Sequence, residues 1–187
     1  MHYNDHSQLE GKHAFLSASK YHWVNYTPEK MMQVYSNYFA TEKGTILHDF
    51  ASRCINLGQK LPRSKKTLNM FVNDAIGFRM RSEQVLYYSD NCFGTTDAIL
   101  YDENAKFLRV HDLKTGVTPS SMCQLEIYAA LFFLEYAVDP QETKMELRIY
   151  QNNEIQVEIP EPTTILYIMQ KIKDFDKLIN DIKENEW

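Results

Sequence analysis

The stretch that decides the fold is GTTDAILYDENAKFLRVHDLKTG, from Gly94 to Gly116. Its two halves, residues 94–101 and 107–114, are rich in β-branched and aromatic residues and flank a polar turn centred between Asn104 and Ala105. This pattern is typical of two strands joined as a hairpin. Because the turn fixes the register, it also predicts which side chains lie opposite one another.

Counting outward from the turn gives three facing pairs: Asp97 with Asp112, Ile99 with Val110, and Tyr101 with Leu108. Since side chains alternate along a strand, we expect these pairs and Lys114 to share one sheet face. Opposed carboxylates repel, so Asp97 against Asp112 favours a bound hard cation, Mg²⁺ or Mn²⁺. An ammonium beside that cation can orient water and stabilise charge on a phosphate. The alternative is that all three residues are solvated strand residues.

Outward from the hairpin, periodicity predicts helices over 28–40, 42–58 and 67–81, strands over 84–89, 94–101 and 107–114, a helix over 119–137, strands over 144–150 and 154–159, and a last helix over 165–182. This order is typical of an α/β domain with a mixed sheet. We expect a single domain over 1–187, with a helical N-terminal portion over about 1–82 and the catalytic sheet with its flanking helices over about 83–187.

Composition excludes several classes of protein. The 187 residues carry 20 Lys and Arg against 25 Asp and Glu, a net charge of −5, so nucleic-acid binding would need a local basic groove. The best candidate for contact with the DNA backbone is the cluster Lys60, Arg63, Lys65 and Lys66, with a solvated loop as the alternative. No apolar run is long enough for a membrane span, and the start lacks a signal peptide, which predicts a cytoplasmic protein without membrane contact.

Three separated motifs carry a family resemblance: GTTD at 94–97, DLKTG at 112–116 and QLEIY at 124–128. In order and spacing they resemble the RecB-like branch of the PD-(D/E)XK nuclease superfamily, phage and bacterial exonucleases included. The match covers about residues 83–136, and GTILH at 44–48 resembles the family's histidine-bearing helix. The resemblance implies a restriction-endonuclease-like core, a mixed β-sheet flanked by helices.

The resemblance also implies roles for individual residues. Metal ligands for Mg²⁺ or Mn²⁺ would be His48, Asp97, Asp112 and the main-chain carbonyl of Leu113. The catalytic set would be Lys114, Asp112, Asp97, Glu83, Gln124 and Tyr128. Relatives that hold an iron–sulphur cluster use four cysteines, three of them near the C-terminus. This chain has no cysteine after Cys123, so we expect no such cluster.

The function implied is a metal-dependent deoxyribonuclease. We expect an exonuclease that hydrolyses DNA ends in recombination, repair or phage DNA metabolism, in a bacterial cell or a phage-infected host. DNA is the expected partner, and a recombination or annealing protein and a second copy of the chain stay open as further partners. Two alternatives also stay open: a structure-specific or nicking endonuclease, and a catalytically silent module with a nuclease-like fold that binds DNA or protein.

Overall fold

The computed structural model describes residues 5–9, 11–12 and 14–185, which fall into two compact units. We call residues 1–42 the N-terminal unit and residues 43–187 the sheet unit. The helices and strands, in chain order, are η1 (Ser7–Leu9), η2 (Ala18–Asn25), α1 (Pro28–Leu57), α2 (Thr67–Gly77), β1 (Arg81–Ser89), β2 (Cys92–Asp102), β3 (Phe107–Leu113), α3 (Cys123–Tyr136), η3 (Pro140–Glu142), β4 (Lys144–Gln151), β5 (Glu154–Glu158) and α4 (Pro162–Asn185). Within the described ranges, no helix combines the length and apolar character that a membrane crossing needs.

The N-terminal unit is small and packs through aromatic rings. The ring of Phe15 lies 5.0 Å from that of Tyr35 and 5.1 Å from that of Tyr38, both on α1. The indole of Trp23 donates a hydrogen bond to the main-chain oxygen of Ser17 at 3.0 Å. Since none of the described residues of this unit is buried, it has no enclosed core of its own.

The first two predicted helices are wrong in one respect: the segments 28–40 and 42–58 form one continuous helix, α1. The break expected at residue 41 is absent, and Gly44, which weakens a helix by only about 1 kcal/mol, lies inside α1 without ending it. Gly44 also lies close to the loop after β3: a Cβ at this position would lie 2.9 Å from the side-chain oxygen of Thr115, so one of the two would have to shift.

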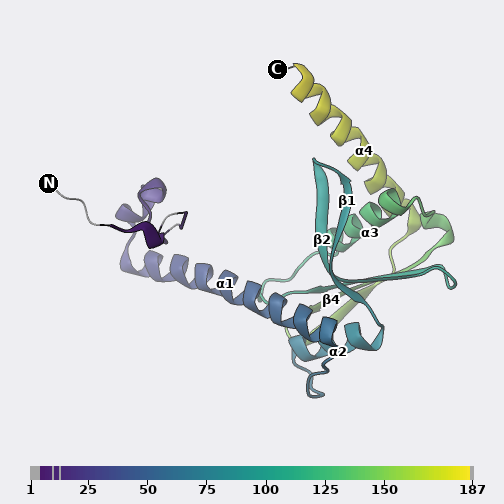
Figure 1. Ribbon diagram of the computed structural model, residues 1–187, viewed down its shortest axis with the longest axis horizontal. Coiled ribbons are helices and arrows are strands. Elements are labelled where there is room, and N and C mark those ends of the chain that lie inside the picture. The colour runs from purple at the N-terminus through teal and green to yellow at the C-terminus, as the bar shows by residue number, and fades with distance from the viewer. Residues whose placement is uncertain (1–4, 10, 13, 186–187) are drawn as a thin grey trace. The chain divides into compact units, whose positions relative to one another are not determined.

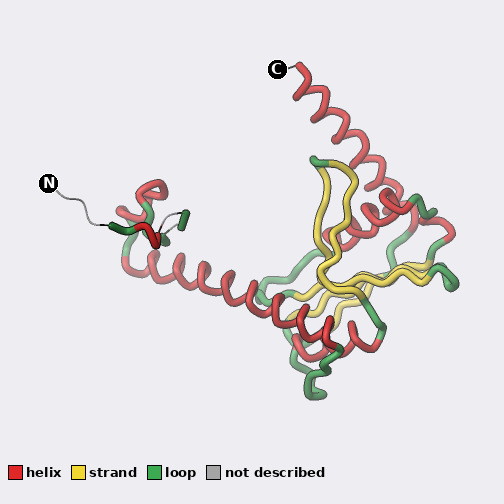
Figure 2. The backbone as a smooth tube through the Cα atoms, in the orientation of Figure 1, coloured by secondary structure: helices red, strands yellow, loops and turns green. Residues whose placement is uncertain are grey.

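The sheet has the order β1-β2-β3-β4-β5 and is mixed, as predicted (Figures 1 and 2). Neighbouring strands are antiparallel except β3 and β4, which are parallel and are connected through α3. The sheet unit is therefore an α/β structure with a five-stranded mixed sheet and flanking helices.

Two apolar layers cover the two faces of the sheet. On one face, Leu108 and Val110 of β3 pack with residues of α3 and α4. On the other face, Leu113 of β3 packs with residues of α1 and α2, among them Phe71 and Ala75. The side chains of β3 thus alternate between the two layers, and both layers hold the strand that carries the central motif.

At Glu83, the side chains of strand β1 change the side of the sheet on which they lie. Ser82 faces α1, where its hydroxyl donates to the side-chain oxygen of Asn56 at 3.0 Å, whereas Leu86 belongs to the core with α3. In a regular strand these positions, four residues apart, would share a face. Glu83 has a φ of +51°, and both it and its neighbour across the ladder, Asp97, are skipped in the pairing of β1 with β2. At this bend the β1–β2 ribbon leaves the plane of the other strands (Figure 1).

Element ends differ from prediction where local backbone geometry intervenes. The helix predicted over 67–81 ends at Gly77, because Arg79 adopts a left-handed φ of +58° and β1 begins at Arg81. The helix predicted to begin at 119 begins at Cys123, which leaves a longer loop after β3.

We predict that the layer between β3 and α3 carries much of the stability. Leu108→Ala, at a fully buried position, should lower the free energy of unfolding by about 2–5 kcal/mol. The matched change Leu57→Ala, at a position that is 77% exposed, should stay within about 0.5 kcal/mol of wild type. Urea unfolding followed by circular dichroism measures both, and equal losses would contradict this packing.

Candidate active site

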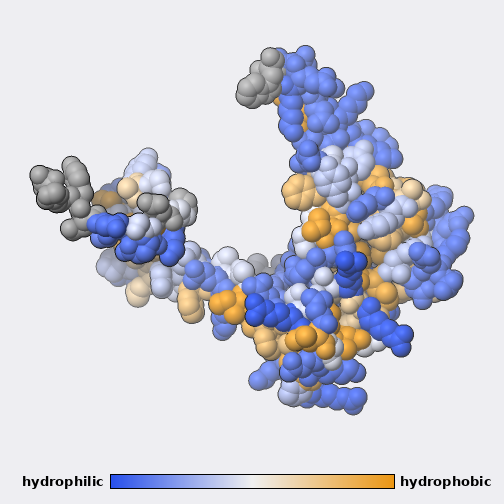
Figure 3. Space-filling model, viewed as in Figure 1, coloured by the Kyte–Doolittle hydropathy of each residue, from blue (hydrophilic) through white to orange (hydrophobic). Residues whose placement is uncertain are grey.

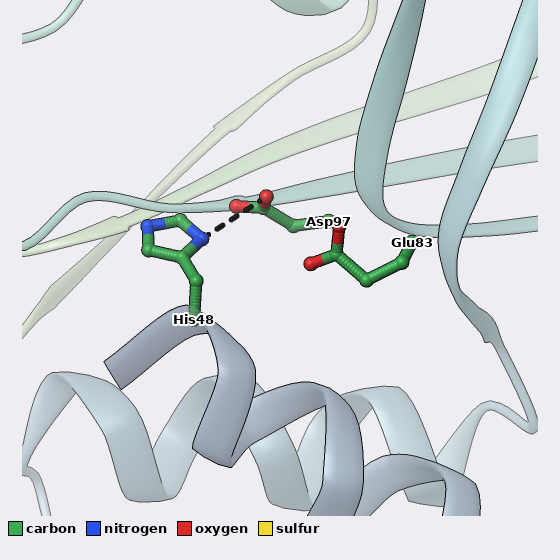
Figure 4. Close-up of side chains that lie close together, drawn as sticks. All are labelled: His48, Glu83 and Asp97. Atoms are coloured by element: carbon green, nitrogen blue, oxygen red, sulfur yellow. Dashed lines mark hydrogen bonds and ion pairs between the residues drawn. The ribbon is translucent and has the colours of Figure 1, made fainter. Parts of the chain in front are cut away.

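Three ligand-type side chains meet at the bend of the β1–β2 ribbon. His48 from α1, Glu83 from β1 and Asp97 from β2 each place one ligand atom within 4.8 Å of the others (Figure 4). His48 Nδ1 lies 3.2 Å from Asp97 Oδ1. The group offers one imidazole nitrogen and two carboxylates, a donor set that suits a hard divalent cation.

The backbone explains why these three residues converge. Glu83 and Asp97 occupy opposite positions of the two antiparallel strands, at the point where both strands exchange faces. The left-handed φ of Glu83 is unusual for a non-glycine residue and costs of order 1 kcal/mol, and such strain clusters at functional sites. Figure 4 shows both carboxylates at this bend, on the side that faces the helix bearing His48.

A second cluster begins at the end of β3 and continues onto α3. The ammonium of Lys114 lies 3.1 Å from Oδ1 and 3.0 Å from Oδ2 of Asp112, and it donates to Gln124 Oε1 at 2.7 Å. Gln124 in turn donates to the hydroxyl of Tyr128 at 3.0 Å. The lysine is therefore held between a buried carboxylate and a side-chain amide that is itself fixed by the next turn of α3.

Asp97 joins the two clusters. Its Oδ2 accepts a hydrogen bond from the main-chain nitrogen of Leu113 at 2.7 Å, between Asp112 and Lys114 in the chain. Its other oxygen faces His48. One carboxylate thus connects β2, the end of β3 and α1.

The electrostatics of the site favour a cation. Burial, and then the charge of Asp97, raise the pKa of Asp112, which is 2% exposed, against the opposing effect of Lys114. Burial and Asp97 also raise the pKa of Glu83. The hydrogen bond to Asp97 raises the pKa of His48. Although Lys114 is close, Oδ2 of Asp112 makes no hydrogen bond of acceptable geometry, so a buried oxygen is left for another ligand.

The expected register is confirmed for the apolar part of the hairpin. Ile99 pairs with Val110 and Tyr101 with Leu108. The pairing then ends at Ala98 and His111, so the expected direct pair of Asp97 with Asp112 is wrong. Asp97 lies at the bend, and its side chain bonds the main chain of the neighbouring strand in place of facing Asp112.

The basic cluster Lys60, Arg63, Lys65 and Lys66 is not brought to these residues by any contact within the described chain. It lies in the exposed loop between α1 and α2, which is fixed to the β4–β5 turn by a hydrogen bond from the nitrogen of Thr67 to Asn153 Oδ1 at 3.1 Å. Its contact with the DNA backbone stays a prediction, as does metal binding by the carbonyl of Leu113.

Sequence reasoning missed a buried polar network behind Asp112. His111, on the opposite face of β3, lies 3.2 Å from the hydroxyl of Tyr150, which donates to Asp74 at 2.7 Å. Burial, and then the charges of Arg148 and Arg109, lower the pKa of His111 to about 2. The sequence shows a histidine next to Asp112, but its partners come from two other elements, so no local pattern indicates the network.

Comparison with known proteins adds no identification: neither a protein-family model nor a curated protein sequence matches the chain. The chemistry of the site is therefore argued from its residues and their geometry.

We predict that burial of His111 makes the free energy of unfolding fall as the pH falls. Its pKa is lowered in the folded state, so as the pH falls below about 6.5 the unfolded chain gains a proton that the folded chain excludes. From pH 7 to pH 5 this should cost about 2 kcal/mol. Glu83 and Asp112, whose pKa values are raised, act in the opposite direction. Urea titrations at pH 7 and pH 5 give the free energy of unfolding of wild type and of His111→Gln. We expect the wild type to lose about 2 kcal/mol more than the variant between the two pH values. The same pH dependence in both proteins would contradict this role of His111.

We predict that His48 contributes to the affinity of the site for metal. His48→Ala removes the only nitrogen ligand of the cluster of three, and we expect Mn²⁺ binding to weaken by about tenfold or more. Isothermal titration calorimetry measures this, with His22→Ala, in the N-terminal unit, as the matched control. An unchanged Mn²⁺ affinity in His48→Ala would show that this histidine is a packing residue.

Proposed function

We propose that this chain is a metal-dependent nuclease that hydrolyses phosphodiester bonds at the ends of DNA. The observation that carries the proposal is the position of Asp112. This buried carboxylate holds Lys114, and the charges of Asp97 and His48, two members of the cluster of three, affect its pKa. Together these residues offer two things that metal-dependent phosphodiester hydrolysis uses: ligand groups suited to a hard cation, and a fixed ammonium.

The residues present fit Mg²⁺ or Mn²⁺. Asp97 and Asp112 would hold the ion, with His48 as a nitrogen ligand and Glu83 in contact directly or through water. Two features support this assignment. The buried Oδ2 of Asp112 has no well-formed hydrogen bond, and among the described residues one ammonium and one imidazole pair with this group of three carboxylates. When bound, such an ion supplies Lewis acidity toward a phosphate oxygen.

Among the side chains of the protein, Lys114 is the one that acts on the attacking water and on the phosphate. Its ammonium is fixed by Asp112 and Gln124, so it can hold an attacking water in line with a phosphorus atom. The same positive charge stabilises the additional negative charge that develops on the phosphate in the transition state. Tyr128 acts as a positioning residue, because its hydroxyl accepts the hydrogen bond that orients Gln124.

The resemblance of the three motifs to RecB-like nucleases supports DNA as the substrate. The same resemblance supports hydrolysis that begins at DNA ends. The net charge of −5 requires local attraction of phosphates. The loop with Lys60, Arg63, Lys65 and Lys66 is the candidate for this role, and binding through it would weaken as the salt concentration rises.

The test is digestion of end-labelled linear DNA and closed circular DNA with Mg²⁺, Mn²⁺ or EDTA. We expect metal-dependent loss of linear DNA, and a decrease of about a hundredfold or more in Lys114→Ala and Asp112→Asn. Lys106→Ala is the matched control, because Lys106 precedes the opposite end of β3 and pairs with Glu142. Circular dichroism shows whether each variant folds.

The outcomes separate the remaining functions. Cleavage of closed circular DNA would replace the exonuclease with an endonuclease that uses the same residues. A wild-type protein that retards DNA in a gel but leaves it intact with Mn²⁺ would contradict hydrolysis and favour a binding module. Equal loss of activity in Lys106→Ala would show that the effect of Lys114→Ala is not specific to the site.

A further inference from the structure

The last helix, α4, carries a regular apolar seam. Its seam residues recur at alternating intervals of three and four: Ile165, Ile168, Ile172, Phe175, Ile179 and Ile182. This spacing is the signature of a helix that packs against another helix in a left-handed coiled coil. A helix that only covers a sheet face needs no such strict repeat along its whole length.

Only the first half of the seam is covered in the described chain. Ile165 is fully buried, and Ile168 and Ile172 pack against the core with α3. Beyond them Phe175 is 55% exposed and Ile182 47% exposed. Leu178, next to the seam, is 53% exposed. The repeat therefore continues for several turns past the point where this chain supplies a partner.

The exposed half of α4 is held in place by the tip of the β1–β2 ribbon. Asp176 accepts hydrogen bonds from Ser89 and from Asn91, and Lys183 donates to Asn91. From the side shown in Figure 3, the outer part of α4 presents mostly hydrophilic surface, and hydrophobic surface gathers where the helix meets the rest of the sheet unit. Because its polar side is bound, the helix is ordered before any partner arrives, which lowers the entropy cost of association.

A groove adjoins the seam where α4 meets α3. It has a volume of about 310 Å³ and is lined by apolar residues that include Ile127, Ile168, Ile172 and Phe175. Cys92, Cys123 and Ile179 also line it, and the polar residues Asn91, Lys171 and Asp176 border it. The apolar part of this lining suits a branched apolar side chain from a neighbouring helix.

We propose that the partner is a second copy of this chain and that two α4 helices pair in antiparallel orientation. With the twofold axis level with Lys177, Phe175 of each copy meets Ile179 of the other. Ile182 of each copy then meets Ile172 of the other, at the edge of the groove. Every exposed seam residue is thereby covered by a seam residue, which is the self-complementarity that a twofold interface requires.

Charge along α4 favours the antiparallel orientation. Residues 171–177 contain three lysines and two aspartates, whereas residues 178–184 contain one lysine and two acids. Antiparallel pairing places the basic part of each helix against the acidic part of the other, and it also opposes the two helix dipoles. A parallel pair would place the basic parts of the two helices against each other, and likewise the acidic parts.

The first test is disulfide cross-linking in full-length protein with Cys92→Ser and Cys123→Ser. Leu178→Cys places the two thiols beside the seam, one residue from the twofold axis, and we expect it to form a covalent dimer under mild oxidation. Lys177→Cys, the adjacent residue on the outer side of the helix, is the matched control and should stay monomeric on a non-reducing gel. Equal cross-linking at both positions, or cross-linking of Ile182→Cys without Leu178→Cys, would overturn the antiparallel arrangement.

The second test is analytical ultracentrifugation of the unmodified chain at micromolar concentrations. We expect a species of twice the mass of one chain, and we expect Phe175→Asp to convert it to the monomer with an unchanged circular dichroism spectrum. Phe175 is exposed in the single chain, so this substitution does not disturb its core. A monomeric wild-type protein would overturn the proposal, whatever its activity on DNA.

Discussion

The candidate site depends on one carboxylate, that of Asp97. One of its oxygens accepts from the main-chain nitrogen of Leu113 and the other faces His48, so a single side chain connects two strands and a helix. An ionised carboxylate gains from both contacts, because charge-assisted hydrogen bonds are stronger than neutral ones. Without it, the β1–β2 bend, the end of β3 and α1 would lack a common polar contact at the site.

The arrangement of the other residues follows from this junction. The bend at Glu83 turns two carboxylates toward α1, and the close approach of Gly44 to Thr115 brings that helix against the loop after β3. On the far side, α3 returns over the end of β3 and supplies Gln124 to Lys114. The sheet thus provides acids, and the two helices provide the histidine and the support for the lysine. Each of these side chains therefore lies on, or directly next to, a helix or a strand, which holds it rigidly.

Much of the fold could be predicted because its signals are local. Alternation in residues 94–114 indicated the hairpin, and its apolar pairs have the expected register. The direct pairing of Asp97 with Asp112 was wrong, because the register rule assumes regular strands and the bend at Glu83 lies in the neighbouring strand β1. The continuity of α1 through residue 41 was also missed, and the close approach of Gly44 to Thr115, distant in sequence, could not be foreseen from a local pattern. The network of His111 with Tyr150 and Asp74 depends on three separate elements, so no local pattern could indicate it.

The central claim is that His48, Asp97 and Asp112 share one hard cation. Anomalous diffraction from a crystal grown with Mn²⁺ tests it most directly. The account predicts a single strong peak between the two aspartates, with carboxylate oxygens and the histidine nitrogen at about 2.0–2.3 Å from the ion. A peak bound elsewhere on the chain, or none at this position with Mn²⁺ in excess, would contradict it.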